Sequence, residues 1–432
     1  MARRRSTRPA PLTHGPAPAD GTVETVRIER IAAGGDGIGH LADGRAVFVP
    51  RSAPGDLLEL AHVARQRSFA RAESGRILEP GPGRVTPACP HYERDRCGGC
   101  QLQHLSPGAQ REARRAIVGD ALRRVGRQDI ADPILEPAAE EWAYRTRITL
   151  HQSDDGRRVG FHRVGRPGDI FDLETCLLAV PAVQELWNVL RLLRRLLPKR
   201  LDAVTLRLER GGARHLLVRG ADAAWPDASR LVDALRARLP DVAVWWQPPE
   251  GAARVVGERV AFPATVFEQV NPPMGDRVRA WAVAALGDVS DQLGWDLYAG
   301  IGETGRMLLG RGARIESVEA DARAVWLAHS LSQPGEAGRL RAHTGLVEDV
   351  IHTLPPPAFV ITNPPRTGMD PRALIAISAS AARRLVYVSC DPATLARDLR
   401  GLDHPWRLVA LRAFDLFPQT AHVETVAVLE RQ

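Results

Sequence analysis

The sequence predicts an α/β protein with an open, mostly parallel C-terminal sheet, a central α+β region and a small N-terminal β-barrel. From about residue 266, short apolar strands alternate with helical segments, as they do in open α/β sheets. The last two strands, WRLVALRAFDLF and HVETVAVLER, have no helix between them, which indicates a final antiparallel strand. Near the N-terminus, short strands are separated by glycine-rich turns, a pattern typical of small barrels.

Four segments follow from these patterns. Residues 1–21 are basic and then rich in proline and alanine, without an apolar segment, so we expect a disordered tail rather than a secretory signal. Residues 22–84 are expected to form a β-barrel of the oligonucleotide-binding type. Residues 85–265 are expected to form a central domain with clustered cysteines, a basic helix and further strands, and residues 266–432 the α/β domain.

The composition favours a cytoplasmic protein that does not enter the membrane. The chain of 432 residues contains no apolar run near the ~18 residues that a membrane span requires. Its formal net charge is +7, and Lys199 is the only lysine among its 58 basic residues. Arginine suits contacts with phosphate and RNA, which favours a nucleic-acid partner, but a GC-rich genome explains the arginine usage equally well. A monomer is the default expectation.

Four of the five cysteines can be explained together. Cys89, Cys97 and Cys100 form a C-x7-C-x2-C pattern, and Cys176 follows in DLETCLLAV. Because disulfides are rare in the cytoplasm, clustered thiols there indicate a metal or redox site.

The spacing of these thiols does not identify the metal. Four thiolates match the ligands of an iron–sulfur cluster, and Gly98 and Gly99 allow the backbone to approach it closely. Zinc is the alternative, held by all four thiolates or with His91 or His104 replacing one of them.

The fifth cysteine, Cys390, lies in VYVSCDPATLARDL, where a buried strand gives way to a helix. Asp391 and Pro392 provide an N-cap and a proline in the first turn. Most free cysteines are small buried hydrophobic side chains. The position of Cys390 just past the carboxyl end of a strand raises the alternative that it is a nucleophile.

A glycine loop follows the first strand of the α/β domain in DLYAGIG, which begins at Asp296. Gly305 completes a G-x-G-x-x-G pattern, which alone is weak evidence. Glu319 ends the next strand, where an acid typically receives the ribose hydroxyls of a nucleotide-like cofactor. The combination predicts either a dinucleotide or S-adenosylmethionine (SAM), and the glycines do not choose between them.

Three further groups are expected at the same crevice, because ligands of such sheets bind outside the carboxyl ends of the strands. The segment Asn363-Pro364-Pro365-Arg366 and Cys390 both follow strands, and Glu424 begins the antiparallel last strand at that edge. A thiol, a carboxylate and a cofactor pocket therefore converge. This favours a nucleophilic role for Cys390.

Together VYVSCDPATLARDL, FPQTAHVE, FEQVN (267–271), NPPRTG and DLYAGIG resemble the RNA uracil-C5 (5-methyluridine) methyltransferases. The resemblance covers nearly the whole chain from about residue 22. It implies a C-terminal SAM-dependent methyltransferase (Rossmann-like) domain, a central domain with a four-iron, four-sulfur (4Fe-4S) cluster held by the four clustered cysteines, and an N-terminal TRAM domain. It also implies that the cofactor is SAM and that the substrate is RNA, mainly 23S ribosomal RNA.

The resemblance also implies roles for individual residues. The Cys390 thiolate adds to uracil C6, which makes C5 nucleophilic enough to take the methyl group of SAM, and Glu424 removes the C5 proton. Contacts with SAM are implied for Gln269, Tyr298, Glu303, Glu319 and Asn363.

Two of these positions depart from the family pattern. Glu303 replaces the usual asparagine and places a negative charge near the expected SAM carboxylate, which weakens binding unless an arginine such as Arg306 compensates. Asn363 replaces the usual aspartate, and Asn-Pro-Pro is also the motif by which amino-group methyltransferases hold an exocyclic amine. The alternatives are therefore an RNA amine N-methyltransferase that uses Asn363, or a non-catalytic RNA-binding protein with a degenerate SAM site. Transfer RNA is the alternative substrate.

Overall fold

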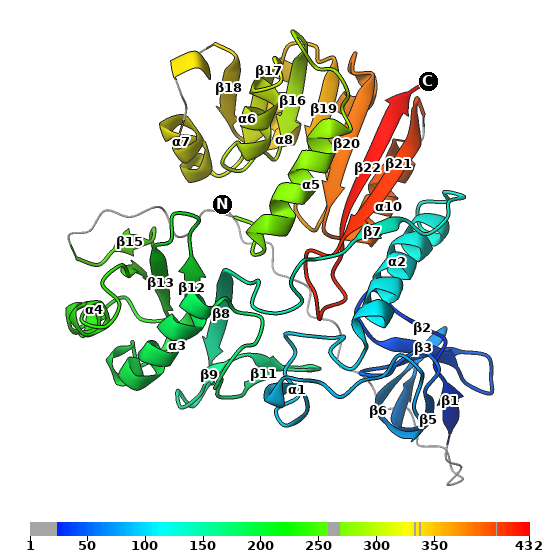
Figure 1. Ribbon diagram of the computed structural model, residues 1–432, viewed down its shortest axis with the longest axis vertical. Helices are drawn as coiled ribbons and strands as arrows, with labels where there is room; N and C mark the ends of the chain where they lie inside the picture. Colours follow the sequence, from blue (N-terminus) through cyan, green and yellow to red (C-terminus); the bar gives the residue numbers. More distant parts are fainter. Residues whose placement is uncertain (1–23, 258–267, 332–333, 337, 403) are drawn as a thin grey trace.

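The computed structural model describes residues 24–257, 268–331, 334–336, 338–402 and 404–432. The expected tail at 1–21, residue Phe267 of FEQVN and the expected boundary at 265/266 lie outside these residues. In the described part, two six-stranded sheets, one eight-stranded sheet and a two-stranded ribbon make up three regions of the chain (Figure 1). No helix in these ranges is long and apolar enough to cross a membrane.

The N-terminal region is a curled six-stranded sheet in the order β1-β5-β6-β4-β3-β2. The long strand β6 pairs with β5 on one side and with β4 on the other, so the sheet can bend around its own core. Val26, Ile28, Val47 and Leu58 are among the side chains buried inside it. The strands are β1 (Thr25–Arg27), β2 (Arg30–Ile31), β3 (Gly37–His40), β4 (Ala46–Val49), β5 (Leu57–Arg65) and β6 (Phe69–Glu79).

The central region is an α+β layer in which helices pack on a sheet of order β15-β14-β13-β12-β8-β9. Trp187 and Leu190 of one helix are buried against this sheet in a single core. The strands are β8 (Arg147–Gln152), β9 (Val159–Gly160), β10 (His162–Arg163), β11 (Arg166–Ile170), β12 (Leu201–Leu208), β13 (Arg214–Gly220), β14 (Ala243–Gln247) and β15 (Arg254–Val255). The helices are α1 (Pro90–Glu93), α2 (Pro107–Arg124), α3 (Pro181–Leu193), the 3-10 turn η1 (Arg194–Leu196) and α4 (Ala228–Arg236).

The C-terminal region is the predicted open sheet, in the order β18-β17-β16-β19-β20-β22-β21-β7. Its neighbouring strands from β18 to β20 are parallel, and β22 is antiparallel to both β20 and β21, as the sequence pattern predicts. The strands are β16 (Leu293–Leu297), β17 (Arg314–Glu319), β18 (Leu340–Thr344), β19 (Phe359–Thr362), β20 (Arg384–Ser389), β21 (Trp406–Phe414) and β22 (Glu424–Arg431). The helices are α5 (Pro272–Ala284), α6 (Glu303–Leu309), α7 (Ala322–Ser330), η2 (Pro334–Glu336), α8 (Val347–Val350), η3 (Ile351–Thr353), α9 (Pro371–Ala379) and α10 (Pro392–Gly401).

One strand of this sheet comes from far away in the sequence. β7 (Ile134–Glu136) lies within the expected central segment, yet it pairs in parallel with β21. Helix α2 precedes it and packs against α10 through Val118 and Leu122. The chain therefore crosses from the cysteine-bearing segment to the C-terminal sheet before it returns to the central region (Figure 1). The division of the chain near residues 84 and 265 stays a prediction.

Candidate active site

Cys390 lies at the junction between β20 and α10. The carboxylate of Asp391 accepts hydrogen bonds from the backbone N–H groups of Ala393 and Thr394, both at 3.0 Å, so it caps the helix as the sequence predicts. This cap holds the turn that presents the thiol at the carboxyl edge of the sheet. Cys390 is a free thiol and is only partly buried, so a reactant can reach it.

Glu424 stands opposite Cys390 in the register of the neighbouring strand. β20 and β22 are antiparallel with Ser389 paired to Thr425, so the next position along the ladder brings Cys390 to Glu424. The Glu424 side chain is buried, with a residue exposure of 1%. Among the described residues, none donates a hydrogen bond to its Oε2 atom. Burial raises the pKa of this carboxyl group to about 8, and Arg366 opposes the shift.

Arg366 completes this group, although the sequence indicated only that its segment faces the crevice. Its guanidinium lies within hydrogen-bonding reach of the Cys390 thiol. Burial raises the pKa of that thiol, the negative charge of Glu424 raises it further, and Arg366 lowers it. Arg366 is therefore the cation that favours the thiolate. The signal in the sequence was a basic residue directly after Asn-Pro-Pro at a strand's carboxyl end.

His422 lies beside the same cation and was not predicted as a site residue. Burial lowers the pKa of its imidazole to about 4, with further lowering by Arg366 and Arg145. The imidazole is thus neutral at physiological pH. It therefore adds no positive charge beside Arg366.

The glycine loop lies at the end of β16, beside the end of β17. Gly300 and Gly302 have positive φ angles of 59° and 77°, a conformation that favours glycine, and Tyr298 shares it with a φ of 59°. The Glu319 carboxylate holds the loop, because its Oε2 accepts a hydrogen bond of 2.9 Å from the Gly300 N–H. Glu319 thus lies at the end of β17, where the sequence predicts an acidic residue, and its hydrogen bond to Gly300 also holds the glycine loop.

Asp296 lies beneath the same loop. Burial raises the pKa of its carboxyl group to about 7, Glu319 adds to the shift, and a hydrogen bond from the backbone of Gly305 opposes it. No donor among the described residues reaches its Oδ2 atom. This buried oxygen therefore offers an acceptor at the floor of the loop.

The arginine that compensates Glu303 is not Arg306. Arg279 of α5 approaches Glu303 at 3.0 Å, and Arg210, from the turn between β12 and β13, approaches it at 3.5 Å. Arg306 instead donates a hydrogen bond of 2.7 Å to the Ile301 carbonyl within the loop. The expectation for Arg306 is wrong because its side chain folds back on its own loop. The Glu303 charge is neutralised from α5 and from the central region.

Gln269 and Asn363 complete the residues expected to contact SAM. The Gln269 side chain lies against Gly275 of α5, at 3.0 Å from the position that a Cβ would occupy there. Asn363 follows β19, its backbone N–H donates a bond of 3.2 Å to the Leu297 carbonyl, and its side chain is exposed. The five residues therefore border one edge of the sheet, around the ends of β16, β17 and β19 and the start of α5.

The four clustered cysteines line one cavity in the central region. Cys89, Cys97, Cys100 and Cys176 all border a space of about 290 Å³. All four are free thiols. Burial raises the pKa of Cys97 to about 12 and also raises that of Cys100, so these thiols stay protonated unless a positive centre stabilises the thiolates.

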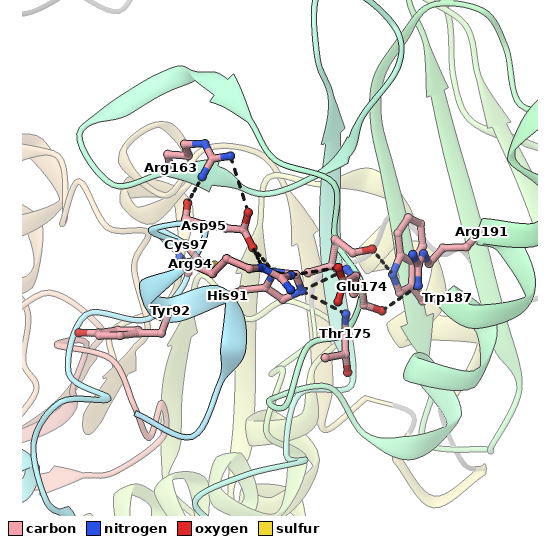
Figure 2. Close-up of polar contacts among 12 residues, drawn as sticks. His91, Tyr92, Arg94, Asp95, Cys97, Arg163, Glu174, Thr175, Trp187 and Arg191 are labelled. Atoms are coloured by element: carbon pink, nitrogen blue, oxygen red, sulfur yellow. Dashed lines mark hydrogen bonds and ion pairs between the residues drawn. The ribbon is translucent and has the colours of Figure 1, made fainter. Parts of the chain in front are cut away.

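His91 is not available as a ligand (Figure 2). Its Nε2 atom accepts a hydrogen bond of 3.1 Å from the Glu174 N–H, and its Nδ1 atom lies 2.7 Å from an Asp95 oxygen. Both ring nitrogens are therefore used, and the ring links the segment of Cys89 and Cys97 to the segment before Cys176.

His104 is engaged in the same way. Its Nδ1 atom is 2.7 Å from the Tyr92 hydroxyl, and its Nε2 atom is 3.0 Å from the Ser52 carbonyl. In the described ranges, no three His, Cys, Asp or Glu side chains are grouped closely enough to hold a single metal ion. This arrangement argues against a zinc ion that His91 or His104 helps to hold.

The fold is that of a class I methyltransferase with an accessory barrel, and a free thiol lies at the carboxyl edge of its sheet. The family profile described as tRNA (Uracil-5-)-methyltransferase matches residues 356–432, and the TRAM domain profile matches residues 19–60. The chain is 30% identical to the 23S rRNA (uracil(1939)-C(5))-methyltransferase RlmD of Dechloromonas aromatica, over 90% of this chain and 95% of that protein. It is 31% identical to the protein of the same name from Chromohalobacter salexigens, over 95% and 90%.

A solved structure shows the same fold. The crystal structure of Pyrococcus abyssi tRNA (uracil-54, C5)-methyltransferase in complex with S-adenosyl-L-homocysteine superposes with a TM-score of 0.70 at 22% identity, covering 94% of this chain and 100% of that chain. The chain belongs to the RNA uracil-C5 methyltransferase family, whose members are SAM-dependent enzymes.

Proposed function

We propose that this protein forms 5-methyluridine in 23S ribosomal RNA, with Cys390 as nucleophile and Glu424 as base. One observation carries the proposal. A partly exposed thiol faces a buried carboxylate with an unpartnered oxygen across one strand pair, and Arg366 lies beside both. An amine methyltransferase requires neither the thiol nor this pairing.

The chemistry follows from these groups. The Cys390 thiolate, favoured by Arg366, adds to C6 of a uracil that has been flipped out of its stack, and the electron pair of the C5=C6 bond moves into an enolate. C5 then attacks the methyl carbon of SAM, and S-adenosylhomocysteine leaves. Glu424 takes the C5 proton, the C5=C6 bond re-forms, and the C6–S bond breaks to release Cys390.

SAM would occupy the edge bordered by Gln269, Tyr298, Glu303, Glu319 and Asn363. Glu319 suits the ribose hydroxyls because its position at the end of β17 is the usual place for that contact. Arg279 and Arg210 neutralise Glu303, so the departure from asparagine is compatible with a bound SAM carboxylate. This supports a working cofactor site rather than a degenerate one.

The cysteine cavity would hold a 4Fe-4S cluster on Cys89, Cys97, Cys100 and Cys176. The support is the set of four thiols around one cavity, beside two histidines whose ring nitrogens are already engaged. The methyl transfer has no redox step, so we assign the cluster a structural or RNA-positioning role.

The substrate is proposed from the relatives. The relatives from Dechloromonas aromatica and Chromohalobacter salexigens are named for 23S rRNA, whereas other relatives of similar coverage are named only as RNA methyltransferases. The solved structure with the same fold is named for tRNA. The matched TRAM domain and the arginine-rich central region are proposed to contact RNA. We further expect a cytoplasmic monomer, in keeping with an enzyme that acts on ribosomal RNA.

The test is mass spectrometry of the protein incubated with SAM and 5-fluorouracil-substituted 23S rRNA, beside Cys390→Ala. Fluorine at C5 cannot leave as a proton, so a methylated protein–RNA adduct should accumulate on Cys390 and be absent from the variant. If no adduct forms while the enzyme still methylates natural RNA, the amine chemistry through Asn363 replaces the proposal. If neither occurs with ribosomal or transfer RNA, the non-catalytic RNA-binding function replaces it.

A further inference from the structure

The loop between β21 and β22, residues 415–423, leads directly into Glu424 and is named here the base loop. It contains neither helix nor strand, yet Leu416, Thr420 and Val423 are fully buried. In Figure 1 it projects from the C-terminal sheet toward the N-terminal and central regions. A buried irregular segment must have its backbone polar groups satisfied by other parts of the chain.

The cysteine-bearing segment provides two of these partners. The Leu102 N–H donates a hydrogen bond of 3.0 Å to the Gln419 carbonyl. The Gln101 Oε1 atom accepts one of 3.4 Å from the Ala421 N–H, while its Nε2 atom donates one of 2.9 Å to the Gly98 carbonyl. Gln101 thus connects the base loop to the turn between Cys97 and Cys100.

Helix α2 provides two further partners. The Gln110 amide accepts a hydrogen bond of 3.0 Å from the Gln419 N–H and donates one of 2.9 Å to the Gln419 side-chain oxygen. This pairing holds Gln419 at a φ of 69°, which is rare for a residue other than glycine. Arg114 donates to the Thr420 carbonyl at 2.9 Å and forms a buried ion pair of 2.8 Å with Asp415.

Tyr144 is the fifth contact and packs beside the cysteine site. Its hydroxyl donates a hydrogen bond of 2.9 Å to the Pro418 carbonyl. Its ring shares a small buried core with Cys100, against which Cys89 and Cys176 also pack. One side of this tyrosine therefore touches the cysteines, and its hydroxyl touches the base loop.

We propose that Gln101, Gln110, Arg114 and Tyr144, named here the anchor residues, are positioning residues for the base Glu424. No described donor reaches the Glu424 Oε2 atom, so the backbone of the base loop and β22 must place that oxygen. The anchor residues fix this backbone from a segment about 300 positions earlier. The inference rests on the proposed function, and it explains how the cysteine site acts on the chemistry without a redox step.

The inference predicts a specific defect when an anchor is lost. A displaced base slows removal of the C5 proton and leaves thiol addition and methyl transfer unchanged. A methylated covalent protein–RNA intermediate should then accumulate on natural RNA, and the rate difference between RNA with hydrogen and with deuterium at uridine C5 should increase. A general loss of stability would reduce all steps alike and would leave this isotope effect unchanged.

The experiment compares Tyr144→Phe with Tyr387→Phe on 23S rRNA carrying hydrogen or deuterium at uridine C5. Both changes remove one buried hydroxyl, but Tyr387 donates its hydrogen bond of 2.7 Å to Asp398 of α10 rather than to the base loop. We expect Tyr144→Phe to slow proton removal about fivefold, the effect of one lost hydrogen bond. Tyr387→Phe should retain the wild-type isotope effect.

Gln101→Ala serves as a second variant, because its side chain is only partly buried and its loss carries little risk to folding. It should show the same accumulated intermediate. A wild-type isotope effect and no intermediate in both Tyr144→Phe and Gln101→Ala overturns the inference while the proposed function stands. If the wild-type enzyme itself forms no adduct with 5-fluorouracil RNA, the proposed function fails and this inference fails with it.

Discussion

Cys390 and Glu424 face each other across the β20–β22 pair, although they are 34 positions apart in sequence, because Ser389 is paired with Thr425. An antiparallel last strand is what makes this possible. The end of β20 and the start of β22 meet at the same edge, so the Cys390 thiol and the Glu424 carboxylate reach that edge from two different strands. The charge of Glu424 raises the pKa of the Cys390 thiol, and Arg366 lowers the pKa of both groups.

Glu424→Gln should strongly reduce turnover and stabilise the fold at neutral and alkaline pH. The carboxyl pKa is raised from 4.5 to about 8 in the folded protein. A raised pKa means that the folded state binds more protons between these values, so the wild type loses stability as pH rises from about 4.5 to 8. The slope is up to about 1.4 kcal/mol per pH unit. Glutamine does not titrate, so the difference in the free energy of unfolding between variant and wild type should grow over that range.

Denaturant unfolding at several pH values measures this difference. Turnover of Glu424→Gln should fall roughly 100-fold or more, as expected for loss of a general base. Asp391→Asn is the matched control for removing a carboxylate near the thiol, because it retains an oxygen for the helix cap. A stability difference that does not change with pH would contradict the buried, titrating carboxyl group.

Arg366→Met should raise the pKa of the Cys390 thiol. The guanidinium lowers this pKa through its charge and its hydrogen bond, so its removal should shift the pH dependence of Cys390 alkylation to higher pH. The rate of iodoacetamide labelling, mapped to Cys390 by peptide mass spectrometry, gives the profile. Arg372→Met is the control, since that arginine of α9 pairs with Asp349 at 2.9 Å instead. Equal profiles for the wild type and Arg366→Met would show that Arg366 does not activate the thiol.

The meeting of Cys390 with Glu424 could be predicted from the sequence, because the strand pattern and the absence of a helix before the last strand determine which chain ends share an edge. The neutralisation of the Glu303 charge by Arg279 and Arg210 could not be predicted from the sequence. Arg279 is on a helix whose direction the pattern does not specify, and Arg210 comes from a turn 93 positions earlier. The pairing of β7 with β21 could not be predicted either, because a strand of three residues carries little periodic signal.

Arg279→Met should weaken SAM binding, and Glu303→Asn added to it should restore the affinity. Without Arg279 the Glu303 carboxylate keeps only Arg210 at 3.5 Å and repels the SAM carboxylate. A partly exposed pair of this kind is worth about 1 kcal/mol, so the dissociation constant should rise roughly fivefold. Calorimetric titration with SAM measures it. Unchanged affinity in Arg279→Met would place the SAM carboxylate away from Glu303.

Iron content should depend on the four cysteines and not on the neighbouring histidines. Anaerobically purified protein should contain iron and acid-labile sulfide in equal amounts, and Cys100→Ala or Cys176→Ala should lose both. His104→Gln should keep them, because both nitrogens of that imidazole already bond to Tyr92 and Ser52. Elemental analysis and visible absorption make the comparison, with Cys390→Ala as the cysteine variant that retains the metal. Zinc in place of iron, lost in His104→Gln, would contradict a cluster held by four thiolates.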